Sequence, residues 1–190
     1  MQSHPSLLEQ EAHTLLGQEK LEEAFRLFRQ AAQAHKQHGN HKQAALCFAS
    51  AASCWARKSG EKTFSNAARS YEEAARQAQQ AHDYAYASQL YRFAAINHER
   101  DGEFLSFSDC YYRSKECFRS FLTVSLFAPH VLDSLITKAE FKGVSGFIKR
   151  LFLCIILTFS YMIWGHGERP GRTFVCGVFI VCTCALLYTF

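Results

Sequence analysis

Proline is nearly missing from the first part of this chain. The 190 residues include three prolines, and none lies between Pro5 and Pro129. Proline inside a helix removes a backbone donor and bends the axis, so nothing in this stretch forces a kink. The sequence therefore permits a series of uninterrupted helices between these two positions.

An excess of charge of one sign is also missing. The chain has 21 Lys and Arg residues against 17 Asp and Glu residues, which gives a formal net charge of +4. Proteins that neutralise a phosphate backbone need a much stronger local excess of positive charge. We therefore expect no nucleic-acid partner.

The sequence lacks the common catalytic motifs. The segment Gly143–Phe147 resembles a nucleophile elbow but has no final glycine, and no His-Glu-x-x-His occurs. Gly165-His-Gly167 resembles part of a phosphate loop, but no strand is expected before it. We expect that the protein is not an enzyme, binds no cofactor and acts by binding.

Three histidines and eight cysteines are the candidates for metal or redox chemistry. His35, His38 and His41 are spaced by three across a turn, but the turn redirects the last one and no cysteine or carboxylate completes a ligand set. We therefore predict a solvated polar turn and no metal. Four of the cysteines form two pairs seven residues apart, as expected for reduced thiols packed on a helix face.

What the chain does contain is one spacing, repeated five times: a small or apolar residue, an aromatic residue four positions later and a small residue three after that. The four clear copies are Ala24, Phe28, Ala31; Ala44, Phe48, Ala51; Ala67, Tyr71, Ala74; and Ala87, Tyr91, Ala94, and a weaker fifth is Phe107, Tyr111, Ser114. These offsets fall on one stripe of an α-helix, where small residues let neighbouring backbones approach. We predict that these residues form the core of the helix interfaces.

The copies start 20, 23, 20 and 20 residues apart, which corresponds to one helix and one turn per copy. Turn signals separate them at Gly17, Gly39-Asn40, Ser59-Gly60, His82-Asp83 and Asp101-Gly102. We predict helices over 5–17, 20–38, 41–58, 61–81, 84–100 and 103–127. The expected fold is all-α, an antiparallel helical-repeat solenoid followed by one or two hydrophobic membrane helices.

The segments Gly39–Ala52 and Ala67–Ala75 resemble the helical layers of soluble NSF attachment proteins and, more loosely, tetratricopeptide repeats. The resemblance covers about residues 5–120 and concerns architecture. It implies a protein-binding solenoid, and as one alternative a cofactor in vesicle fusion. The C-terminal part typical of attachment proteins has no counterpart here.

The sequence changes character after Pro129. We predict a helical-repeat domain over 1–128, an amphipathic linker over 129–146 and a membrane segment over 147–190. Two uncharged runs, Leu151–Trp164 and Thr173–Phe190, carry the membrane prediction. The second is long enough to cross a bilayer, whereas the first is short and either crosses or lies in the membrane plane. The alternative is two buried helices that cap the solenoid.

The polar loop between the two runs resembles the start of the pore module in a group of bacterial potassium-channel-like proteins. The matching residues of the loop are Gly165, Gly167, Glu168, Arg169, Pro170 and Arg172. The resemblance implies that the chain is the regulatory or assembly part of such a protein. No selectivity filter, which would coordinate ions through its carbonyls, follows within this sequence.

Together these features predict a membrane-anchored adaptor that binds a protein or peptide on its solenoid surface. The partners expected are this ligand and a lipid bilayer, and self-association is compatible with the sequence. Lysines and arginines precede both apolar runs, which by the positive-inside tendency favours a repeat domain facing the cytoplasm.

Overall fold

A computed structural model of the chain describes residues 4–58 and 63–127, together with isolated positions between 148 and 178. The continuous part of it is six α-helices, with no strand among the described residues. Their bounds are α1 Pro5–Gly17, α2 Leu21–Gln37, α3 His41–Arg57, α4 Thr63–Gln80, α5 Tyr84–Arg100 and α6 Phe104–Phe127. The predicted all-α class is confirmed, and each predicted helix end lies within two residues of the observed one.

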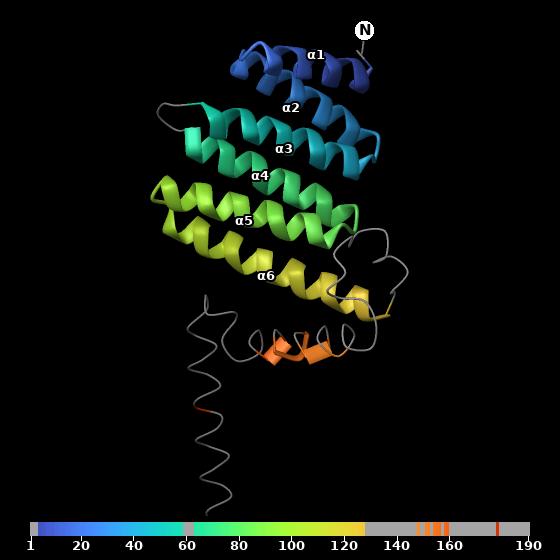
Figure 1. Ribbon diagram of the computed structural model, residues 1–190, viewed down its shortest axis with the longest axis vertical. Helices are drawn as coiled ribbons and strands as arrows, with labels where there is room; N and C mark the ends of the chain where they lie inside the picture. The colour runs from blue at the N-terminus through green and yellow to red at the C-terminus, as the bar shows by residue number, and fades with distance from the viewer. Residues whose placement is uncertain are drawn as a thin grey trace, which may run out of the picture. The chain divides into compact units, whose positions relative to one another are not determined.

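The six helices stack in a row in chain order, each beside the next, as Figure 1 shows. The turns that the structure describes are short, and neighbouring helices run antiparallel (Figure 1). The predicted solenoid arrangement of the helices is therefore confirmed.

None of the helices within the described residues is long and apolar enough to cross a membrane. The predicted linker 129–146, the loop 165–172 and nearly all of the segment 147–190 lie outside the described residues. The chain divides into two compact parts, Met1–Phe118 and Arg119–Phe190, and the division falls within α6.

The interfaces between the helices are built from small side chains, as the repeated spacing predicts. Eleven of the twelve residues in its four clear copies are buried: Ala24, Phe28, Ala31, Ala44, Phe48, Ala51, Ala67, Ala74, Ala87, Tyr91 and Ala94. The eight alanines among them have no exposed surface, and Phe28 and Tyr91, each 1% exposed, fill the space that the alanines leave. Close backbone approach with interspersed aromatic rings thus gives a core made of two clusters of buried residues, one around Ala24, Phe28 and Ala51 and a larger one that includes Phe48 and Tyr91.

The exception among the twelve is Tyr71 of α4. It is partly buried and packs beside Phe93, with ring centroids 5.6 Å apart. Tyr71 thus packs against the core but is less buried than the other eleven residues, and it lies next to the exposed Phe93.

Four of the turns share one hydrogen-bonding pattern. The third residue after the helix donates its N–H to a carbonyl five positions earlier: Lys20 to Leu15 at 3.0 Å, and Asn40 to His35, Asp83 to Ala78 and Glu103 to His98 at 2.9 Å each. This bond closes a Schellman motif, which needs a left-handed residue just before the donor. In the four turns, in chain order, the left-handed residues are Glu19 (φ 61°), Gly39 (φ 73°), His82 (φ 58°) and Gly102 (φ 80°).

The predicted left-handed cap at Gly17 is wrong. Gly17 is the last residue of α1, and the left-handed conformation falls on Glu19 two positions later. The six-residue geometry of the Schellman motif fixes which position must turn, and a glycine nearby does not move it. The turn predicted at Ser59-Gly60 lies outside the described residues.

The helices α1–α3 and α4–α6 form two equivalent three-helix units. The left-handed residues Glu19 and His82 are 63 positions apart, and so are Gly39 and Gly102. Further pairs at this offset are Ala24/Ala87, Leu27/Leu90, Phe28/Tyr91, Arg29/Arg92, Ala31/Ala94, Ala32/Ala95 and Cys54/Cys117. A longer repeat of three helices is therefore superimposed on the single-helix spacing.

Candidate functional site

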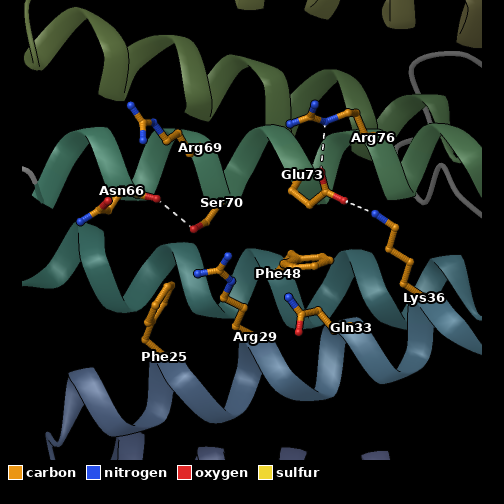
Figure 2. Close-up of a pocket in the computed structure, with 10 residues that line it drawn as sticks. All are labelled: Phe25, Arg29, Gln33, Lys36, Phe48, Asn66, Arg69, Ser70, Glu73 and Arg76. Carbon is orange, nitrogen blue, oxygen red and sulfur yellow. Dashed lines mark hydrogen bonds and ion pairs between the residues drawn. The ribbon is translucent and has the colours of Figure 1, made fainter.

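A groove runs between α2 and α4, with α3 beneath it (Figure 2). It has a volume of about 470 Å³, a size typical of ligand pockets. The residues that line it are Phe25, Arg29, Gln33 and Lys36 from α2, Phe48 from α3, and Asn66, Arg69, Ser70, Glu73 and Arg76 from α4. On each of the two outer helices these positions recur at helical spacing, so each helix presents one face to the groove.

The side chains of the groove carry four positive charges and one negative charge. Glu73 accepts a hydrogen bond from Lys36 Nζ at 2.9 Å and lies 3.3 Å from Arg76 Nε. Burial would raise the pKa of Glu73, but the hydrogen bond from Lys36 and the charges of Arg76 and Lys36 outweigh it and lower the pKa. One end of the groove is therefore an ion-pair network that spans α2 and α4.

The other end of the groove holds two arginines without carboxylate partners. Within residues 4–58 and 63–127, neither Arg29 nor Arg69 forms an ion pair. Figure 2 accordingly draws ion pairs only at Glu73. Phe25 and Phe48 provide apolar surface in the same groove. The site therefore offers two free guanidinium groups next to aromatic side chains.

The three histidines that the sequence places around one turn do not meet. His41 Nδ1 donates a hydrogen bond to Gln77 Oε1 at 2.9 Å, which links α3 to α4. His35 instead contacts Glu9 of α1. His38 is the residue directly after α2 and is exposed. The prediction of a solvated polar turn is thus wrong for His35 and His41, because each makes a side-chain contact with a neighbouring helix.

Sequence reasoning did not find the groove. Arg29, Lys36 and Arg69 occupy exposed positions on amphipathic helices, where charged residues are ordinary. Only the packing of α2 and α4 on the two sides of α3 brings them together. The loop residues predicted at 165–172 lie outside the described residues, so their placement adds nothing to this site.

Comparison with known proteins gives no relatives: no family model, no curated protein and no solved structure matches this chain. The resemblances to attachment proteins and to channel-like proteins therefore stay predictions from the sequence.

Proposed function

We propose that the helical stack is a protein-binding adaptor whose groove between α2 and α4 holds an acidic peptide. The observation that carries the proposal is the pair of arginines, Arg29 and Arg69, that have no carboxylate partner among the described residues. An arginine binds a carboxylate through two parallel hydrogen bonds, which makes it well suited to acidic side chains. Helical-repeat arrays commonly bind peptides in such grooves.

The chemistry of the groove also favours a mixed ligand. Phe25 and Phe48 can pack against an apolar side chain, while the arginines bind acidic groups beside it. Glu73 already neutralises Lys36 and Arg76, so the free positive charge is concentrated at Arg29 and Arg69. A peptide of alternating acidic and apolar residues fits this pattern best.

The test is a binding titration with a fluorescein-labelled peptide of alternating Glu and Leu residues, followed by fluorescence polarisation. Charge reversal of both arginines, Arg29→Glu with Arg69→Glu, is expected to weaken binding by about tenfold or more, since charged hydrogen bonds contribute about 1.5–3 kcal/mol each. A peptide with Lys in place of Glu should not bind.

The matched control is Arg92→Glu, which reverses the charge of an arginine outside the groove. Arg92 lies at the position of α5 equivalent to Arg29 in α2, is exposed and does not line the groove. Binding should be nearly unchanged in this variant. Equal weakening by Arg92→Glu, or no binding by the native chain, would refute the groove as the site.

The membrane-anchored part of the proposal depends on the sequence of 147–190 alone, with its two uncharged runs. We expect the chain to remain with membranes after a carbonate wash, and a tag at Met1 to be digested by protease added from the cytoplasmic side. Release by carbonate would contradict the anchor without affecting the peptide test. No described residue favours the channel-like or vesicle-fusion alternatives over the adaptor.

A further inference from the structure

Two clusters of potential metal ligands occupy equivalent places in the two three-helix units. One consists of Glu9, His35 and Cys47, and the other of Glu72, His98 and Cys110. Each cluster, called here a Glu–His–Cys cluster, takes one residue from each of three consecutive helices. In each, one ligand atom per residue lies within 4.8 Å of the others. All three pairs of equivalent residues are 63 positions apart.

The clusters are shielded from solvent. Cys47 and Cys110 are buried at 3% and 2% exposure, and the side chain of His98 is 6% exposed. The carboxylates are less buried, with 18% of the Glu9 side chain and 23% of the Glu72 side chain exposed. A small ion can therefore reach each cluster from the carboxylate side, while the sulfur and imidazole stay inside the stack.

The ligands of each cluster already interact. His98 Nε2–H donates to Glu72 Oε1 at 2.8 Å, and His35 makes the same contact with Glu9. Burial and the nearby carboxylate raise the pKa of the Cys47 and Cys110 thiols to about 12. Without a metal, both cysteines are thus protonated thiols beside a carboxylate.

Each cluster histidine keeps one ring nitrogen without a hydrogen-bond partner among the described residues. This nitrogen is Nδ1 of His35 and of His98, and it is buried in both. Other equivalent positions around the clusters differ between the units, such as Gln43 and Ser106 or His41 and Phe104. Helix packing alone does not require the same carboxylate, imidazole and thiol in both units.

We propose that each Glu–His–Cys cluster binds one Zn²⁺ ion through a carboxylate oxygen, an imidazole nitrogen and a cysteine sulfur. Zinc takes all three ligand types at about 2.0–2.3 Å, which puts ligand atoms roughly 3.3–3.8 Å apart in a tetrahedron. The three ligand atoms of each cluster, which lie within 4.8 Å of one another, must draw closer to reach this geometry. The ion replaces the thiol proton, which passes to solvent, and the carboxylate and thiolate then balance its two positive charges. A water molecule takes the fourth position.

The test uses the full-length chain in detergent, stripped with a chelator and then loaded with Zn²⁺ or with Co²⁺ as a spectroscopic probe. Metal content is measured by elemental analysis after removal of free ions. Cys47→Ala and Cys110→Ala should each lose one ion relative to the native chain, and the double variant should lose two. The Co²⁺ complex should show sulfur-to-metal charge-transfer absorption that falls in the same proportion.

The matched controls are Cys54→Ala and Cys117→Ala. These cysteines are also buried, lie on the same helices seven positions later and are equivalent to each other, but belong to neither cluster. Both controls should keep the native metal content. Loss of an ion in the controls, or no loss in Cys47→Ala and Cys110→Ala, would overturn the proposal.

A variant that keeps both thiols guards against misfolding as the cause of metal loss. Glu72→Gln retains the shape of the side chain and removes its charge, and far-ultraviolet circular dichroism checks that the helices persist. Co²⁺ affinity at the second cluster should fall by more than about tenfold, because even outer-shell changes around bound metals cost about 10–100-fold. Unchanged affinity in a folded variant would exclude Glu72 as a ligand and refute the site.

Discussion

The interface between α1, α2 and α3 should not tolerate a charge. Ala51 of α3 has no exposed surface and belongs to a core cluster with Ala12, Ala24 and Phe28. In Ala51→Glu a carboxylate enters this cluster of apolar side chains. An uncompensated buried charge costs about 3–5 kcal/mol, which is a large part of the roughly 5–15 kcal/mol that stabilises a typical domain.

This cost should depend on pH in a defined direction. Burial raises the pKa of the new carboxyl in the folded state above its unfolded value of about 4.3. The penalty is therefore small below the unfolded pKa, where the group is neutral in both states, and grows as the pH rises to 7. Urea denaturation followed by circular dichroism at pH 4 and pH 7 measures both values.

The control is Ala56→Glu, which introduces the same side chain at an exposed position of the same helix. At pH 7 the buried variant should melt lower than this control by about 10 °C or more, since 1 kcal/mol shifts the melting temperature by about 2–8 °C depending on domain size. Equal stability of the two variants would show that Ala51 does not lie in a helix interface.

Three further predictions concern local features. Gly39→Ala should cost about 1 kcal/mol in urea denaturation because its φ is 73°, whereas Gly17→Ala in α1 should cost nothing. Tyr91→Phe removes the donor to Gln79 Oε1 at 2.9 Å and should cost about 0.5–1.5 kcal/mol in the same assay; no loss would argue against that bond. Cys110, with a pKa of about 12, should resist iodoacetamide at pH 8 until the chain is unfolded, as mass spectrometry would detect.

The repeated spacing was enough to predict the helices and most of the turns. Small residues and aromatics on one stripe can be buried only if helices stack, so Ala24, Phe28 and Ala31 carried the fold prediction directly, as Ala74 and Ala94 did for the α4–α5 pair. The left-handed cap predicted at Gly17 was wrong because glycine permits a left-handed conformation without requiring one. Glu19 adopts that conformation instead, because the hydrogen bond from Lys20 to Leu15 requires it there.

The groove and the Glu–His–Cys clusters depend on contacts between helices, which local periodicity does not contain. His35 lies four residues after Ala31 and so continues the buried stripe of α2. Its contact with Glu9 could not be predicted from local spacing, because the two residues lie far apart in the sequence. A comparison of the chain with itself at an offset of 63 would have aligned His35 with His98 and Glu9 with Glu72. That comparison was the missing signal, because the spacing of single helices concealed the longer unit.

An odd number of helices in each unit has a consequence for chain direction. Because neighbours run antiparallel, α4 points opposite to α1, and the second unit is turned end for end relative to the first. Orientation is restored only after two units. Deleting or inserting one whole three-helix unit would therefore preserve the packing surfaces but make the last helix end on the opposite side of the stack. Evolution of this architecture by single-unit steps would thus change the side on which any following segment begins.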